Sequence, residues 1–302
     1  MFRSVRWCFA TGLVLLIGLQ LFSFLYYVRE QRLLTAYFDR VARPSLPPSE
    51  QVKAVVLSLK DKPDDGNNSY FLFPFLRFLR PTPGQVIFKG GDCADRSRLV
   101  IALLARRGIH ASKWALYNAR GESVHAVVQA DVESGKMVAD PLFGLWFPKR
   151  QDGYYAIRDL KEDPAILLNR LAELRASNAR PGAARWDFYP SAQYVYSDAR
   201  TINWSKSLIL KLSYWLLRRV MGQRADELAR PAFVEEPPLI VIYGTAALEF
   251  IVLLVWLGIR RWQWKRRTTA AAGWHRIAEK TVGVVRDVQM KGREDGSGFL
   301  DH

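Results

Sequence analysis

Cysteine and histidine are scarce in this chain. Its 302 residues include only two cysteines, Cys8 and Cys93, and four histidines. Cys8 lies in an apolar run near the N-terminus, so a disulfide framework is excluded. Paired ligands spaced as C-x₂-C or H-x₃-H are also missing, which argues against a zinc site built from Cys93, His110 and His125. We therefore expect no metal and no cofactor.

Charge is almost absent from two long stretches. Trp7–Val28 contains no charged residue, and Leu239–Ile259 contains only Glu249. Each is long enough to cross about 30 Å of hydrocarbon. A cleaved signal peptide is the alternative for the first stretch, but no A-x-A-like cleavage site follows it. We predict two transmembrane helices, in which Glu249 is either a tolerated neutral side chain or a contact with another membrane subunit.

The positive charge of the chain indicates its topology. The 44 Lys and Arg exceed the 29 Asp and Glu, for a net charge of +15, but they are spread along the chain. Five basic residues follow the second apolar stretch within residues 260–267, whereas Glu235 and Glu236 precede it. The positive-inside rule then places both termini in the cytoplasm of a bacterial-type inner membrane and the domain between the spans in the periplasm. Nucleic-acid binding by the basic tail would rest on charge alone, so we expect no nucleic-acid partner.

The chain therefore divides into five predicted segments. These are an N-terminal tail with the first span (1–28), a periplasmic domain (29–203), an amphipathic helix and connector (204–238), the second span (239–259) and a basic cytoplasmic tail (260–302). Further helices are expected at Arg29–Val41, Ser49–Leu59 and Ala270–Met290. The segment Trp204–Val220 is apolar with basic residues intruding, which fits either a helix lying in the membrane interface or a buried core helix.

The segment Gly90–Ile109 has the pattern of a capped helix. Asp92 suits the N-cap, with Asp95 three positions later, and Gly108 suits the C-terminal end. An apolar stripe at helical spacing is formed by Leu99, Val100, Leu103 and Leu104. Cys93 is then the first residue of the helix, where the macrodipole stabilises a thiolate. Because Asp92 and Asp95 oppose this effect, Cys93 needs a cationic partner.

Three strand-like runs follow this helix. They are Ala111–Tyr117, Ser123–Ala130 and Lys136–Asp140, separated by Gly-containing turns. His125 lies in the middle run and Asp140 ends the next, so antiparallel pairing can place the two side chains on one face. The helix N-terminus packed against that face would bring the Cys93 sulfur to one imidazole nitrogen and Asp140 to the other. A nucleophile, its base and an orienting group would then be in line.

These motifs resemble the transglutaminase-like superfamily of papain-like fold. G-x-C at a helix start, LLARRGI at its end, HAV in a strand and D-P after the next strand cover about Val86–Trp146, and GGDCAD also resembles bacterial transglutaminase-like cysteine proteinases. The resemblance implies an α+β fold with Cys93 as nucleophile, His125 as general base and acid, and Asp140 as its orienting partner. In one departure, Val127 stands where many members have an aromatic residue.

Donors for an oxyanion hole are harder to place. The backbone N–H of Cys93 is one candidate. Gln85, eight residues before Cys93, is another by analogy with papain-like layouts. Tyr70 and Trp114 are further candidates that no pattern favours.

The resemblance implies acyl transfer at an amide or ester through a Cys93 thioester, by hydrolysis or by transfer to an amine. The expected substrate is a peptide, a protein or an amide-bearing envelope polymer. Residues 148–203 are a candidate binding surface, with Trp186, Tyr189, Tyr194 and Tyr196. The alternative is a catalytically silent binding or scaffold subunit of an inner-membrane envelope-polymer or secretion assembly.

Overall fold

The computed structural model describes residues 2–64, 70–72, 76, 79–178, 184–228, 230, 233 and 235–264. The chain divides into two compact units, one from residues 1–18 and 244–302 and one from residues 19–243. The helix expected at Ala270–Met290, and the basic tail beyond residue 264, lie outside the described residues.

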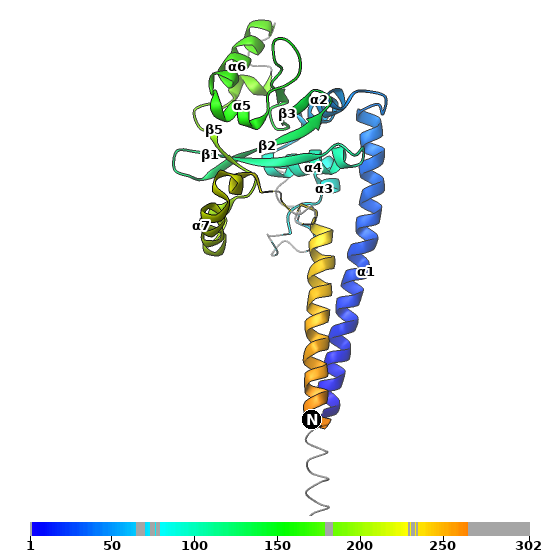
Figure 1. The fold of residues 1–302 in the computed structure, drawn as a ribbon. Helices are drawn as coiled ribbons and strands as arrows, with labels where there is room; N and C mark the ends of the chain where they lie inside the picture. The colour runs from blue at the N-terminus through cyan, green and yellow to red at the C-terminus, as the bar shows by residue number, and fades with distance from the viewer. Residues whose placement is uncertain are drawn as a thin grey trace, which may run out of the picture. The chain divides into compact units, whose positions relative to one another are not determined.

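Two helices are long and apolar enough to cross a membrane. The first candidate span is Phe9–Val41 within α1 (Phe2–Val41), and the second is Pro237–Trp264, blue and orange in Figure 1. Both predicted apolar stretches lie in these helices. The predicted helix Arg29–Val41 is not a separate element, because α1 continues into it from the span without a break.

Three shorter helices have start signals in the sequence. Pro48 occupies the first turn of α2 (Pro48–Leu59), where its missing N–H has no helical partner to lose. The unexpected helix α3 (Pro83–Lys89) begins at a capping box formed by Thr82 and Gln85. As predicted, α4 (Cys93–Ala105) starts after Asp92, whose Oδ1 accepts a hydrogen bond of 2.8 Å from the N–H of Asp95.

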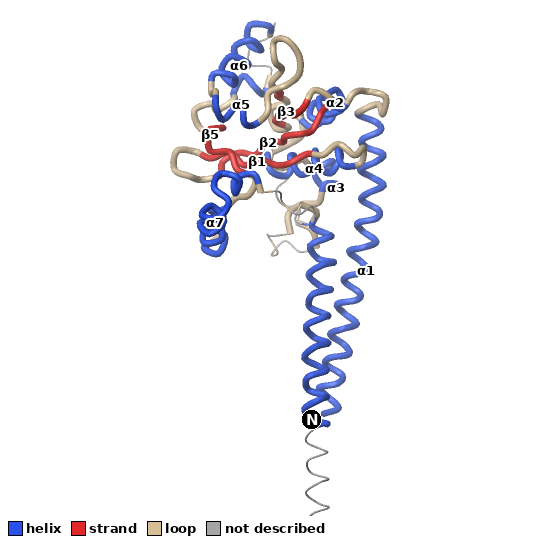
Figure 2. The backbone as a smooth tube through the Cα atoms, in the orientation of Figure 1, coloured by secondary structure: helices blue, strands red, loops and turns tan. Residues whose placement is uncertain are grey.

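A five-stranded antiparallel sheet forms the centre of the second unit (Figure 2). Its strand order is β4 (Leu145–Trp146), β3 (Gly135–Asp140), β2 (Ser123–Val132), β1 (Ala111–Tyr117) and β5 (Val195–Arg200). The three predicted strands are confirmed as β1, β2 and β3, with ends that differ from the prediction by at most two residues. The fold is therefore α+β.

The two faces of the sheet contribute to two apolar cores. Alternate residues such as Val128 and Met137 pack with α2, α4 and the end of α1. The intervening residues, such as Val127 and Val138, pack with α5 (Ile157–Glu162) and α6 (Ala165–Ser177). Because side chains alternate along a strand, the two sets of helices cover opposite faces (Figure 1).

The chain after the sheet forms short helical turns and one amphipathic helix. These elements are η2 (Arg185–Phe188) before β5, then η3 (Trp204–Lys206), α7 (Leu208–Met221) and η4 (Gly222–Glu227). The helix predicted from Trp204 starts at Leu208, because the Ser207 hydroxyl caps it by accepting from Leu210 N–H at 3.2 Å. No α7 residue is buried, so the interpretation of this segment as a buried core helix is wrong.

Candidate active site

His125 and Asp140 form a buried pair on neighbouring strands. Val128 of β2 lies opposite Ala139 of β3, and this register puts His125 diagonally across from Asp140 on the same face. His125 Nε2 lies 2.6 Å from Asp140 Oδ2, and neither side chain is exposed. The other carboxyl oxygen of Asp140 accepts backbone hydrogen bonds from Leu142 and Phe143, which fixes the carboxylate.

The surroundings of His125 favour its charged form. Burial lowers its pKa, but the charge of Asp140 and the hydrogen bond to Asp140 raise it, and Cys93 adds a smaller upward effect. The net result is a pKa raised from 6.5 to about 10. These surroundings favour the imidazolium form of His125 at neutral pH, and a cationic neighbour is what the sequence leads us to expect for Cys93.

Cys93 lies at the first turn of α4, half-buried and free of any disulfide. Ser97 Oγ lies 2.7 Å from the carbonyl oxygen of Cys93 and 3.3 Å from that of Ala126, so the first turn of α4 is fastened to β2 beside His125. His125 Nδ1 is buried and makes no hydrogen bond of good geometry among the described residues. Since Cys93 also raises the pKa of His125, its side chain is a neighbour of this ring.

The packing of α4 corrects one expectation. The helix was expected to pack on the face that carries His125 and Asp140. Its apolar stripe instead packs with Val128, Ala130 and Met137. These residues alternate along the strands with His125 and Asp140, so they lie on the opposite face of the sheet. Only the first turn of α4 reaches His125.

Arginines neutralise the two aspartates beside Cys93. Arg80 Nη1 lies 3.0 Å from Asp92 Oδ2 and 3.6 Å from Asp95 Oδ1, and Arg98 Nη2 binds Asp95 directly. Burial lowers the pKa of Arg80, but the charges of Asp92, Asp95 and, more weakly, Cys93 raise it above its ordinary value. The Arg80 guanidinium therefore lies close enough to Cys93 to interact with its charge. No sequence pattern indicated this proximity.

Another arginine fixes the loop before α4. The fully buried Arg96 side chain donates to the carbonyl oxygens of Gly91 at 3.0 Å and Leu59 at 2.6 Å, and to Asp64 Oδ1 at 2.7 Å. Gly90 has a φ of +77°, and a Cβ there would lie 2.0 Å from the carbonyl oxygen of Pro63. The position of Cys93 is thus set by close backbone packing.

An aromatic side chain covers His125. The Tyr194 ring is stacked on the imidazole, with centroids 4.2 Å apart and an interplanar angle of 3°. Phe143 and Tyr189 meet the same ring edge-on. Burial, followed by the charges of Cys93 and Asp140, raises the pKa of Tyr194, so its phenol stays protonated at neutral pH.

Of the four aromatic residues proposed for a binding surface, Tyr194 is the one that stacks on His125. Tyr189 and Tyr196 are buried and join through their hydroxyls at 3.3 Å, and Trp186 packs against the same core. Val127 is also fully buried, opposite Trp114, so it is a core residue.

The side-chain oxyanion candidates have other surroundings. Gln85 Oε1 accepts the Thr82 N–H at 2.9 Å and thereby caps α3. Trp114 is buried and donates to Ser112 at 3.0 Å, and Tyr70 lies half-buried outside any helix or strand. The first N–H groups of a helix have no partner within it, so Cys93 and Ala94 offer backbone donors at the head of α4.

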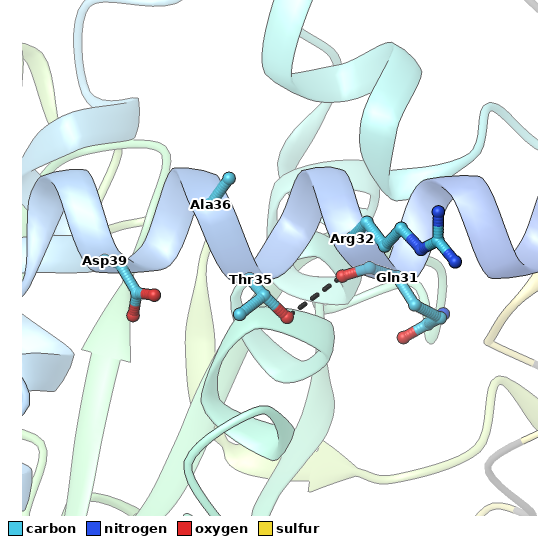
Figure 3. Close-up of a pocket in the computed structure, with 5 residues that line it drawn as sticks. All are labelled: Gln31, Arg32, Thr35, Ala36 and Asp39. Carbon is cyan, nitrogen blue, oxygen red and sulfur yellow. Dashed lines mark hydrogen bonds between the residues drawn. The ribbon is translucent and has the colours of Figure 1, made fainter.

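The described residues include no metal cluster, and the surface hollow in Figure 3 is lined by residues other than Cys93, His125 and Asp140. Among the described residues, no three His, Cys, Asp or Glu side chains are grouped to hold a metal ion, and His110 is an exposed neighbour of Asp131. Figure 3 shows a shallow hollow along one side of α1, where Thr35 donates to the carbonyl oxygen of Gln31. Residues of this single helix line it, and it includes no triad residue.

Comparisons with protein-family models, with curated proteins and with solved structures each found no match.

Proposed function

We propose that this protein is a membrane-anchored cysteine hydrolase or acyltransferase with a transglutaminase-like, papain-like core. The observation that carries the proposal is the environment of His125. Its Nε2 is bound to a buried carboxylate, and its charged form is favoured beside the Cys93 thiol. An imidazolium that a carboxylate orients is the partner that activates a thiol nucleophile.

In the acylation step, the proton of the Cys93 thiol resides on His125 as an imidazolium, and the sulfur anion attacks the carbonyl carbon of an amide or ester. A C–S bond forms as the bond to the leaving amine or alcohol breaks. The His125 imidazolium gives its proton to that leaving group, and Asp140 holds the ring in place throughout. The products are a thioester on Cys93, a neutral imidazole and the released amine or alcohol.

In the deacylation step, water or an amine attacks the thioester carbonyl. The neutral His125 takes the proton of the attacking group, and the C–S bond breaks. The acyl group leaves as an acid or as a new amide, and the thiolate–imidazolium pair is restored. The backbone N–H groups of Cys93 and Ala94 are the donors we assign to the developing oxyanion.

The Cys93 side chain is accessible from the surface of the domain. Cys93 is half-buried, and its helix starts among charged side chains on the domain. We further propose that the domain faces the periplasm and that the substrate is a peptide, a protein or an amide-bearing envelope polymer. The basic residues after the second span support this orientation.

Trapping of the thioester tests this proposal. Membranes containing the full chain are incubated with isolated envelope polymers and proteins plus hydroxylamine, which converts an acyl thioester into a hydroxamate. We expect hydroxamate with the wild-type protein and with Cys8→Ser, the matched cysteine control, and none with Cys93→Ala or His125→Ala. Equal hydroxamate from all four proteins would show that no Cys93 thioester forms.

A scaffold function is the second candidate, and one observation favours it. Glu249 Oε1 is buried and has no hydrogen-bond partner among the described residues, although it lies in a span. The Glu249 side chain is only partly covered within this chain, so a polar group from another membrane subunit would pair with the rest of the carboxyl group. Co-purification of a membrane subunit that Glu249→Leu abolishes, together with no hydroxamate, would favour the scaffold over the enzyme.

A further inference from the structure

The helix α7 (Leu208–Met221) carries an unpartnered apolar face. Six large apolar side chains lie within about half of its circumference, and each is between 58% and 79% exposed: Leu208, Ile209, Leu212, Trp215, Leu216 and Val220. These positions recur at helical spacing, so they form one continuous surface. We call these six residues the α7 apolar face.

The opposite side of α7 is attached to the domain. Tyr214 donates to Asp226 Oδ1 at 2.7 Å and stacks on Trp204 with ring centroids 5.3 Å apart. Asp226 is itself held to the sheet, because its carbonyl oxygen accepts the N–H of Thr201 at 2.9 Å. Since Tyr214 lies across the helix from Leu212 and Leu216, this attachment keeps the α7 apolar face directed outward.

Basic side chains flank the α7 apolar face. Lys211 is exposed and lies beside it, and the Arg219 guanidinium sits 4.7 Å from the centre of the Trp215 ring within it. Arg218 is also exposed, but its Nη1 donates to the Tyr214 hydroxyl at 3.0 Å on the attached side of the helix. Acidic residues are absent from the whole helix. A flexible basic side chain that crosses an apolar surface with its charge at the edge is suited to a boundary between hydrocarbon and phosphate.

The occupant of this face is indicated by the rest of the chain. The second membrane-length helix starts at Pro237, only a short connection after α7 ends at Met221, and the first begins near the N-terminus. The domain is therefore tethered on both sides to helices that can cross a bilayer, and α7 is close to one tether in sequence. Its basic rim is complementary to lipid phosphates, not to hydrocarbon alone.

We propose that α7 lies on the surface of the membrane that these helices cross, with its apolar face in the headgroup–acyl boundary and its basic residues on anionic phospholipid. The contact would fix the domain relative to the membrane at a third point. This inference does not depend on the proposed enzymatic activity, because it rests on α7 and its attachment.

Site-directed spin labelling of the full chain tests the contact. A nitroxide is attached at Leu216→Cys in a Cys8→Ser, Cys93→Ala background, with one protein per nanodisc containing phosphatidylcholine and phosphatidylglycerol. Its collisions with oxygen, which concentrates in lipid, are compared with those of a nickel complex, which stays in water. Arg120→Cys, in an exposed turn, is the matched control, and Leu212→Cys repeats the test on α7.

We expect oxygen collisions to dominate at positions 212 and 216 and nickel collisions to dominate at position 120. Replacing Lys211 or Arg219 with Gln should lower the ratio of docked to undocked α7 about fivefold per charge removed. Nickel dominance at both α7 positions would overturn the proposal. Low accessibility to both reagents would also overturn it, because it indicates that protein covers this face. In a second preparation with two copies per nanodisc, spin–spin broadening would overturn it for the same reason.

Discussion

The two nitrogens of the His125 imidazole have different surroundings. Nε2 is committed to Asp140 at 2.6 Å, whereas Nδ1 is buried without a well-formed hydrogen bond among the described residues. Desolvation of an imidazolium opposes protonation, and the nearby carboxylate outweighs it. The protonation of His125 therefore depends on Asp140.

The protonation of His125 can be measured directly. Because its pKa is raised to about 10, we expect an imidazolium at pH 7 that loses its proton only as the pH rises through about 10. In Asp140→Asn, burial acts without the compensating charge, so titration should fall to 6.5 or lower. Nitrogen-15 NMR of histidine-labelled protein in detergent reads both values. A neutral wild-type His125 at pH 7 would contradict this account.

Substitution of Tyr194 separates the effect of its ring from that of its hydroxyl. Tyr194→Phe keeps the stack on His125 and should leave the reactivity of Cys93 near the wild-type value. Tyr194→Ala uncovers the imidazole and removes a contact worth about 1 kcal/mol, so reactivity should fall several-fold. The rates of Cys93 alkylation in the two variants show whether the ring or the hydroxyl of Tyr194 matters. Loss of reactivity in Tyr194→Phe would instead assign the role to the hydroxyl.

The sequence indicated some site residues better than others. Asp92, Gly108 and the turns around His125 are local signals, so the elements carrying Cys93, His125 and Asp140 could be predicted. Tyr194 reaches His125 from more than fifty residues away, and no periodicity links them. Thr82-Pro83-Gly84-Gln85 is a capping-box pattern, so the side chain of Gln85 takes part in a helix start, and its role as an oxyanion donor stays a prediction.

At the scale of elements, the loop from Gly90 to Asp92 sets the start of α4. Gly90 adopts a left-handed φ against the backbone of Pro63, and its N–H bonds back to Val86 at the end of α3. The Arg96 side chain, one turn into α4, donates to the carbonyl oxygen of Leu59 at the end of α2. The helix can therefore place Cys93 only if position 90 stays without a side chain.

Two alanine substitutions test this packing. Gly108→Ala meets no atom within 4 Å, so only the left-handed backbone penalises it, by about 1 to 2 kcal/mol. Gly90→Ala is penalised more strongly, because its φ of 77° and ψ of −161° lie in a region that only glycine adopts readily, and it also forces a Cβ against Pro63, so it should lose at least about 3 kcal/mol in total. Denaturant unfolding in detergent compares the two. Similar losses would show that the loop can relax.

Element prediction worked where periodicity and punctuation agreed. Strands β1 to β3 alternate between two apolar cores and are separated by Gly turns, and α4 has both caps. The elements α5, α6 and β5 were not predicted. Helix α6 buries only Leu167 and Leu171, so its apolar stripe is short, and β5 pairs with β1 across a long stretch of chain. Such pairing is a tertiary effect that local sequence does not encode.

At the scale of the whole molecule, two candidate spans enclose one domain in the sequence. The apolar residues of the spans are exposed in both helices, as lipid-facing residues would be. Figure 1 shows the domain as a sheet with helices on both faces. Along the chain, these elements follow the first candidate span and precede the second. The second compact unit begins at Leu19 and ends at Tyr243, so it includes the later part of the first candidate span and the start of the second.

The proposed topology predicts which cysteines a reagent can reach in intact cells. In a Cys8→Ser, Cys93→Ala background, Arg120→Cys in the domain should react with a membrane-impermeant maleimide before lysis. Ser297→Cys in the basic tail should react only after lysis, because the positive-inside rule keeps that tail in the cytoplasm. Gel-shift labelling reads both. The reverse pattern would place the domain, and any substrate, in the cytoplasm.

The activated thiol is the central claim, and the alkylation rate of Cys93 tests it most directly. Full-length protein in detergent is treated with iodoacetamide at pH 7, and peptide mass spectrometry follows Cys93 separately from Cys8. If His125 maintains a thiolate, wild-type Cys93 should react about tenfold faster than Cys93 in His125→Ala, with Asp140→Asn in between. Equal rates in the three proteins would contradict the account.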